Sequence, residues 1–153
     1  MGGVERDMLT PPTVAVIGGG QLARMMQESA IALGINLRAL VEAEDGSTGL
    51  VTVDKAVGAP QDLDAVRALS DGADVLTFEH EHIPAQTMEE AARVVSVQPP
   101  ASALLYAQDK LQMRARLSEM GIPCPAWARV DNAAELERFG AVIGWPLIVK
   151  TPR

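Results

Sequence analysis

The segment from residue 14 to residue 26 constrains the fold of this chain more than any other. It reads Val-Ala-Val-Ile-Gly-Gly-Gly-Gln-Leu-Ala-Arg-Met-Met, so a short apolar run leads into three glycines and then an amphipathic stretch. The spacing predicts a helix over 21–33, capped by Gly34, with an apolar face made of Leu22, Met25, Met26, Ser29, Ala30 and Leu33. A strand, a glycine turn and a helix in this order are typical of a parallel α/β sheet.

The rest of the chain continues this pattern as far as Pro100. Strands are expected at 35–41, 51–57, 74–78 and 94–97, and helices at 62–69 and 84–93. The order predicts a doubly wound, Rossmann-like parallel sheet with helices on both faces. We therefore expect a disordered leader over 1–12 and a domain over 13–100.

Residues 101–153 have a different pattern. They are expected to be helical up to Met120, with a break near Gln108, and to form strands at 126–130 and 147–150. Asn132 and Glu135 match a capping box at the start of a helix between these strands. The segment is interpreted as a linker helix and the beginning of a second domain that continues beyond residue 153; a complete small protein with an edge strand is the alternative.

Composition limits the possible functions. The net charge is -7 and the sequence pI about 4.8, and no cluster of Lys and Arg appears, so general nucleic-acid binding is not expected. No stretch is apolar enough for a membrane span. The one cysteine, Cys124, cannot form an internal disulfide, which suits a reducing cytoplasm.

The glycine loop is a candidate anion site. Gly18, Gly20 and Ala23 match the G-x-G-x-x-[GA] pattern, and Glu42 ends the next strand. This pattern alone favours an NAD(P)-dependent oxidoreductase, although glycines also serve purely to turn the chain. Gln21 at the helix start favours a bound ligand.

A polar segment, Thr77–Pro84, follows a central strand where ligands of open α/β sheets bind. If the segment is extended, Glu79 and Glu81 share one face and could accept hydrogen bonds from an amine and ribose hydroxyls. A solvated loop is the alternative. His80 and His82 share the other face and lack a third metal ligand, so a structural role is preferred.

Two lysines stand out in the second segment. Lys110 begins a helix, and Lys150 ends the last apolar run before a turn. Either ammonium group could reach a nucleotide phosphate, and solvent exposure is the alternative.

Together these motifs resemble those of the N5-carboxyaminoimidazole ribonucleotide synthase family of ATP-grasp enzymes. The resemblance rests on residues 17–26, 77–84, 108–111, 121–123 and 148–151, in the family's order and at similar spacing. His82 departs from the family's usual residue at that position.

The resemblance implies a pre-ATP-grasp domain followed by an ATP-grasp domain, in an ATP-dependent carbon–nitrogen ligase of purine biosynthesis. Bicarbonate would carboxylate 5-aminoimidazole ribonucleotide, with release of ADP and phosphate. Gly20, Gln21, Leu22 and Glu79 would hold the ribonucleotide, with Glu81 as a further candidate.

The resemblance also assigns Lys110 and Lys150 to ATP. The Mg²⁺ ligands would lie beyond residue 153, so no catalytic or metal residue is expected within this chain and the chain alone should be inactive. A cytoplasmic homodimer that binds small molecules, with no nucleic acid or membrane partner, is implied. A formate-dependent glycinamide ribonucleotide transformylase and a non-catalytic nucleotide-sensing or interaction domain are alternatives.

Overall fold

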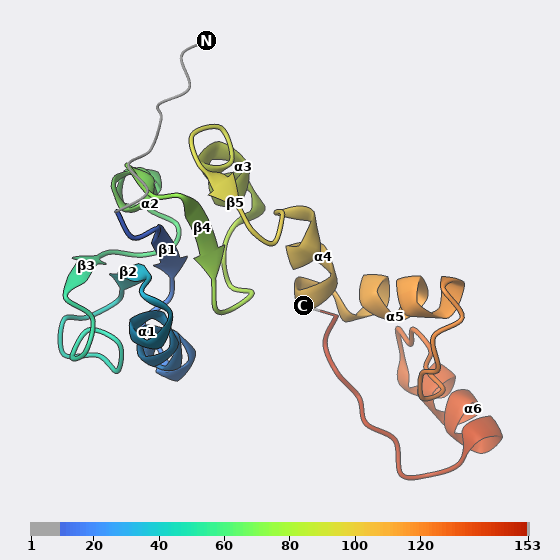
Figure 1. Cartoon of the computed structure of the whole chain (residues 1–153). Coiled ribbons are helices and arrows are strands. Elements are labelled where there is room, and N and C mark those ends of the chain that lie inside the picture. The colour runs from blue at the N-terminus through green and yellow to red at the C-terminus, as the bar shows by residue number, and fades with distance from the viewer. Residues whose placement is uncertain (1–9, 153) are drawn as a thin grey trace. The chain divides into compact units, whose positions relative to one another are not determined.

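The computed structural model describes residues 10–152 (Figure 1). The chain divides into two compact units, residues 1–101 and residues 102–153. Of the expected leader, residues 1–9 lie outside the described residues, and 10–12 form irregular chain. Within the described range, no helix is long and apolar enough to cross a membrane.

The first unit is built on a five-stranded sheet in the order β3-β2-β1-β4-β5. The strands are β1 (Thr13–Ile17), β2 (Asn36–Val41), β3 (Asp54–Val57), β4 (Val75–Phe78) and β5 (Ser96–Val97). Every pair is parallel, and Val16 of the central strand pairs with Ala39 of β2 and Thr77 of β4. The α/β class and the parallel sheet predicted from the sequence are confirmed.

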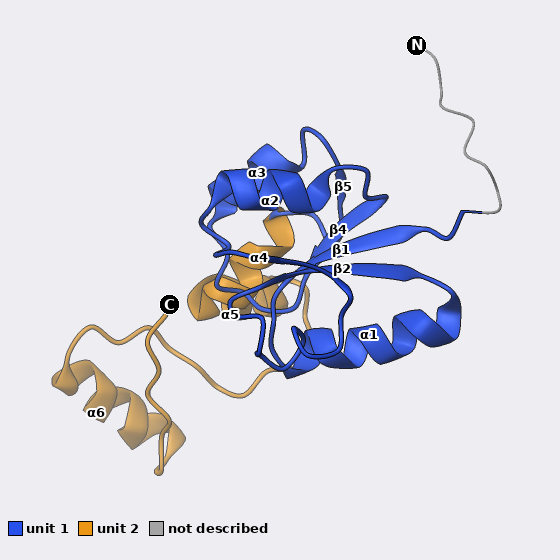
Figure 2. Ribbon diagram, turned by 90° about the vertical axis from the view of Figure 1, so that its left-hand side faces the viewer, with its two compact units in different colours: residues 1–101 blue, residues 102–153 orange. Residues whose placement is uncertain are grey.

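Helices cover both faces of this sheet. Figure 2 shows α1 (Gln21–Leu33) on one side of the strands, with α2 (Leu63–Ser70) and α3 (Ala85–Ala91) on the other. Gly34 caps α1 in the left-handed conformation, at φ 67°, as expected.

The predicted apolar face of α1 is wrong in one respect. Of the predicted face, Ala30 is buried and Met26 packs partly buried against the core. Leu22, Met25 and Leu33 are more than half exposed, and Ala23, outside the predicted face, is buried. Small alanine side chains let the helix approach the sheet closely, and the larger side chains then fall at its flank. There they line an apolar groove of about 400 Å³.

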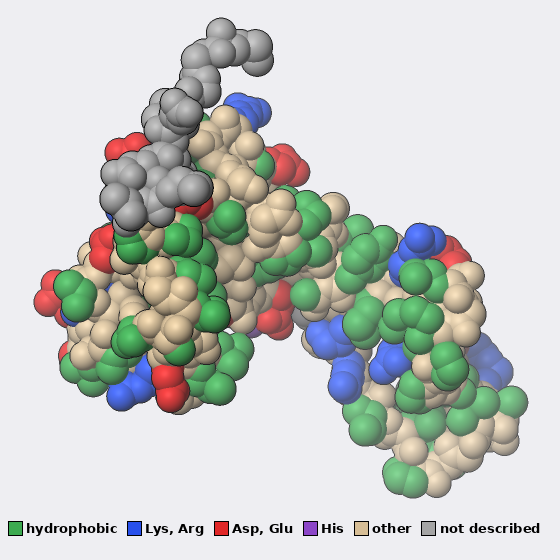
Figure 3. Space-filling view, viewed as in Figure 1, with side chains coloured by type: hydrophobic (Ala, Val, Ile, Leu, Met, Phe, Trp, Pro, Cys, Tyr) green, Lys and Arg blue, Asp and Glu red, His purple; other side chains and the backbone are tan. Residues whose placement is uncertain are grey.

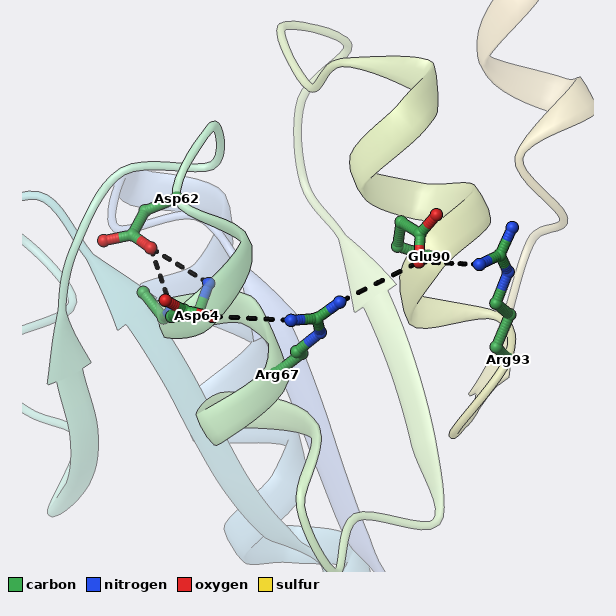
Figure 4. Close-up of polar contacts among 6 residues, drawn as sticks. Asp62, Asp64, Arg67, Glu90 and Arg93 are labelled. Atoms are coloured by element: carbon green, nitrogen blue, oxygen red, sulfur yellow. Dashed lines mark hydrogen bonds and ion pairs between the residues drawn. The ribbon is translucent and has the colours of Figure 1, made fainter.

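Polar contacts connect α2 to α3 on the second face (Figure 4). Asp62 caps α2 by accepting hydrogen bonds from two backbone N–H groups of its first turn. The guanidinium of Arg67 lies 3.5 Å from Asp64 and 3.9 Å from Glu90, and Glu90 also pairs with Arg93 at 3.0 Å. Such surface ion pairs each contribute little to stability, so apolar packing holds these helices together.

The second unit contains three helices: α4 (Ser102–Gln108), α5 (Lys110–Glu119) and α6 (Ala133–Ile143). The predicted break near Gln108 is confirmed, because Asp109 leaves the helical conformation and caps α5 through the N–H groups of Leu111 and Gln112. The predicted cap of α6 by Asn132 is confirmed as well, although the returning bond of the capping box goes to the residue before the cap. Asn132 accepts from the N–H of Glu135, whose carboxylate reaches back to the N–H of Asp131.

The strands predicted at 126–130 and 147–150 are wrong. Both segments are irregular chain, and neither forms a ladder with another part of the described residues. β-Branched and apolar runs favour an extended chain, but a strand exists only when a neighbour satisfies its backbone groups.

Candidate functional site

The glycine loop lies at the carboxyl end of β1, between the ends of β2 and β4. The N–H of Gly18 donates to the carbonyl oxygen of Leu40 in β2 at 3.1 Å. On the other side, the N–H of Glu79 donates to the carbonyl oxygen of Ile17 at 3.2 Å. Pairing of β4 with β1 therefore brings Glu79, far away in sequence, directly against the loop.

The carboxylate of Glu79 occupies the N-terminus of α1. Its Oε1 accepts a hydrogen bond from the N–H of Gly20 at 2.8 Å, and its Oε2 accepts one from the N–H of Ala23. The first N–H groups of a helix lack partners within the helix and carry partial positive charge. The expected phosphate-binding groups are thus satisfied by an anion of the protein itself.

A second segment, the loop after β2, holds the opposite side of the glycine loop. Thr48 is fully buried there; its N–H donates to the carbonyl oxygen of Gly19 at 3.1 Å, and its hydroxyl to that of Gly20 at 2.7 Å. The sequence pattern gave Thr48 no role. Nothing in the local sequence signals that a threonine there reaches the glycines.

The neighbouring side chains of α1 also contact this loop. Gln21 accepts a hydrogen bond from the hydroxyl of Ser47 at 3.1 Å, and the guanidinium of Arg24 donates to the Ser47 carbonyl oxygen at 2.9 Å. Gln21 is exposed and remains accessible to a ligand, whereas Leu22 lines the apolar groove described above. The structure therefore brings Gly20, Gln21 and Glu79 together and places Leu22 at the groove.

The segment after β4 is bent, so the expected alternation of its two faces does not occur. The N–H of His82 donates to Nδ1 of His80 at 3.2 Å, and the Glu81 carboxylate lies 3.8 Å from Nε2 of His82. Across residues 10–152, no group of three His, Cys, Asp or Glu side chains is placed to hold a metal ion. The two histidines form a local turn.

The two candidate ATP-binding lysines both belong to the second unit. The N–H of Lys110, at the start of α5, donates to the carbonyl oxygen of Pro152 at 3.0 Å. Pro152 follows Lys150 by two residues, so this bond brings the end of the described chain to the beginning of α5. Lys110 is half-buried and Lys150 exposed.

Charge divides unequally between the two units. Residues 1–101 contain 15 acidic and 6 basic residues, whereas residues 102–153 contain 5 acidic and 7 basic ones. Figure 3 shows Lys and Arg side chains gathered on the second unit. An anionic ligand is therefore attracted more strongly to the segment that carries the two lysines than to the first unit.

A protein-family model described as the ribonucleotide synthetase preATP-grasp domain matches residues 12–108. This range covers more than half of the chain and includes both the glycine loop and Glu79. The chain belongs to this ribonucleotide synthetase family.

Curated relatives agree with this family membership. The N5-carboxyaminoimidazole ribonucleotide synthase of Mycobacterium tuberculosis H37Rv is 46% identical over 143 residues, which are 93% of this chain and 33% of the relative. The protein of the same name from Corynebacterium ammoniagenes is 41% identical over 93% of this chain and 35% of its own length. The resemblance inferred from the sequence motifs is confirmed, and the chain spans about a third of the length of these relatives.

Solved structures of this family share the fold. The N5-carboxyaminoimidazole synthetase from Staphylococcus aureus complexed with ADP superposes with a TM-score of 0.81 at 28% identity, over 92% of this chain and 38% of that one. The synthase from Aspergillus clavatus, in complex with ADP and 5-aminoimidazole ribonucleotide, gives a TM-score of 0.78 at 34% identity over 91% and 38%. The predicted fold class, a parallel α/β sheet of the pre-ATP-grasp type, is confirmed. That residues 101–153 begin an ATP-grasp domain stays a prediction.

Proposed function

We propose that this chain forms the ribonucleotide-binding part of an ATP-dependent carbon–nitrogen ligase of purine biosynthesis. The enzyme carboxylates the exocyclic amine of 5-aminoimidazole ribonucleotide with bicarbonate and releases ADP and phosphate. The observation that carries this proposal is 46% identity to a synthase of that reaction over 93% of the chain. The ribonucleotide in the Aspergillus clavatus relative supports the same substrate.

The residues of the glycine loop suit the proposed substrate. The side-chain amide of Gln21 is exposed beside the loop and can bond a polar group of the ribonucleotide. The half-buried carboxylate of Glu79 has lone pairs beyond the two that the loop uses, and these can accept from ribose hydroxyls or an amine. Gly20 and Leu22 border the same end of α1, and Glu81 follows in the bent segment.

ATP binding is assigned to the second unit. The backbone bond from Lys110 to Pro152 supports this assignment, because it joins the start of α5 to the segment that carries Lys150, and an ammonium group of either lysine can contact ATP phosphates or the adenine. Mg²⁺ would neutralise phosphate charge during transfer of the γ-phosphoryl group to bicarbonate. The described residues offer it no cluster of three ligands.

The assembly and location follow from the same proposal. A ligase of small metabolites needs neither a nucleic acid nor a membrane partner, and the single cysteine suits the cytoplasm. We propose a cytoplasmic homodimer; sedimentation equilibrium of the purified protein measures its mass.

A chimeric enzyme tests the activity. Residues 12–153 would replace the corresponding segment of the Mycobacterium tuberculosis relative, and ADP release would be measured with each substrate omitted in turn. We expect release that needs both 5-aminoimidazole ribonucleotide and bicarbonate, with ¹³C-bicarbonate carbon appearing in the product. ADP release that depends instead on formate and glycinamide ribonucleotide, or hydride transfer to NAD(P), would refute the proposal.

Site variants in this chimera test the residue roles. Gln21→Ala and Glu79→Ala should raise the KM for the ribonucleotide at least tenfold and leave the KM for ATP within twofold. Glu89→Ala, on the exposed side of α3, is the control for removal of a charge. An unchanged ribonucleotide KM in both site variants would remove Gln21 and Glu79 from the binding site.

A further inference from the structure

The glycines of the loop make room for a side chain of this protein. A Cβ added at Gly18 would overlap the Cγ of Glu79, and Gly18 also has a φ of +143°, which side-chain-bearing residues rarely adopt. A Cβ at Gly20 would lie 2.9 Å from Oε1 of Glu79. The approach of the Glu79 carboxylate therefore requires a glycine at position 18 and favours one at position 20, whether or not a ligand is bound.

The carboxylate is held from several directions. The backbone N–H of Glu79 donates to the carbonyl oxygen of Ile17 in β1. The two carboxylate oxygens of Glu79 accept hydrogen bonds from different N–H groups at the N-terminus of α1. Thr48 holds the loop's carbonyl groups on the other side. The loop thus has its conformation without any ligand, and its donors at Gly20 and Ala23 face a negative charge.

A phosphate at this position would meet two obstacles. It would need the N–H groups that Glu79 already uses, and its own charge would lie beside the carboxylate. An anion tethered to the protein also loses less freedom on binding than one that arrives from solution. In the dinucleotide-binding version of this motif these N–H groups receive a pyrophosphate.

We propose that Glu79 is a specificity-determining residue that fills the anion site of the glycine loop, so that the loop rejects phosphate and pyrophosphate groups. A ligand of the loop must then present a hydrogen-bond donor, such as a hydroxyl or an amine, to the carboxylate. Removal of the carboxylate opens an anion site at the N–H groups of Gly20 and Ala23. This inference holds whichever reaction the complete enzyme performs.

Titration of the ¹⁵N-labelled 153-residue chain with inorganic phosphate and with pyrophosphate, at constant ionic strength, tests the proposal. The amide chemical shifts of Gly20 and Ala23 report binding at the loop. The wild-type chain should show no saturable shift at these amides. Glu79→Ala should show a saturable shift. Its dissociation constant for phosphate should be at least tenfold smaller than the lower limit on the dissociation constant of the wild type.

Two further variants make the result decisive. Glu79→Gln removes the charge but retains one acceptor oxygen and most of the side-chain volume, so this variant should fold. Its affinity for phosphate should lie between that of the wild type and that of Glu79→Ala. Glu89→Ala removes an equal charge from exposed α3 and should behave as the wild type.

The proposal is overturned by saturable phosphate binding at these amides in the wild type. It is equally overturned when the folded Glu79 variants bind no better than the wild type; should Glu79→Ala fail to fold, Glu79→Gln and the wild type still decide. The titration uses neither the ribonucleotide nor ATP. A titration that contradicts the role of Glu79 therefore does not contradict the proposed reaction. A chimera assay that contradicts the proposed reaction likewise does not contradict the role of Glu79.

Discussion

Two buried threonines near the glycine loop should respond in opposite directions to the same substitution. Thr48 and Thr52 are 0% and 1% exposed. The hydroxyl of Thr48 donates to the carbonyl oxygen of Gly20 at 2.7 Å, whereas the hydroxyl of Thr52 has no hydrogen-bond partner among the described residues. Valine has nearly the same shape as threonine and lacks the hydroxyl.

The expected magnitudes follow from these contacts. Thr48→Val removes one buried hydrogen bond but leaves the Gly20 carbonyl its second donor, the N–H of Arg24, at 3.2 Å. The free energy of unfolding should therefore fall by about 1 kcal/mol. Thr52→Val removes a hydroxyl that was desolvated without compensation and adds a buried methyl group, so the free energy of unfolding should rise by about 1 kcal/mol.

Thermal melts and hydrogen exchange measure the two effects. About 1 kcal/mol corresponds to a shift in Tm of about 4–8 °C for a domain of this size, downward for Thr48→Val and upward for Thr52→Val. Amide exchange in β1 and β2 should change about fivefold in the matching directions, which assigns the change to the first unit. Shifts of the same sign in both variants would refute the reasoning.

Three further predictions concern the loop, a helix cap and the lysines. Gly18→Ala should lower the free energy of unfolding by about 2 kcal/mol, since the new Cβ overlaps Glu79 at a strained φ. Adding Glu79→Ala relieves the overlap but not the strained φ, so a double-mutant cycle from urea melts should give a coupling above about 0.5 kcal/mol; additive effects would contradict this. Asp62→Ala removes the cap of α2 and should lower stability by about 1 kcal/mol in the same melts. In the chimeric enzyme, Lys110→Met and Lys150→Met should each raise the KM for ATP at least fivefold without changing that for the ribonucleotide, and an unchanged ATP KM would exclude the lysine from the ATP site.

The helix α1 shows how far periodicity predicts packing. The sequence pattern located the helix and its glycine cap correctly, because both depend on local backbone preferences. It placed Ala30 on the buried face correctly, but it also placed Leu22, Met25 and Leu33 there and left out Ala23, which is fully buried. The spacing of side chains along a helix is local, but the distance between helix and sheet depends on both surfaces.

The segments 126–130 and 147–150 show the same limit for strands. Their composition predicts extended chain, and the structure leaves them irregular because no other part of the described residues pairs with them. The strands of the first unit were predicted correctly since each apolar run there has a parallel neighbour. Strand formation is a property of pairs of segments, so a single segment cannot determine it.

The sequence by itself determined the glycine loop between a buried strand and a helix, the parallel α/β class and the resemblance to a ribonucleotide synthetase family. These depend on local conformational preferences and on motifs that can be read along the chain. Only the tertiary structure decided what the loop holds. The pairing of β4 with β1 places the Glu79 carboxylate on the N–H groups of Gly20 and Ala23, across an interval of more than fifty residues. The sequence pattern of this loop predicts a phosphate-binding site, but in the folded protein the carboxylate of Glu79 occupies that site.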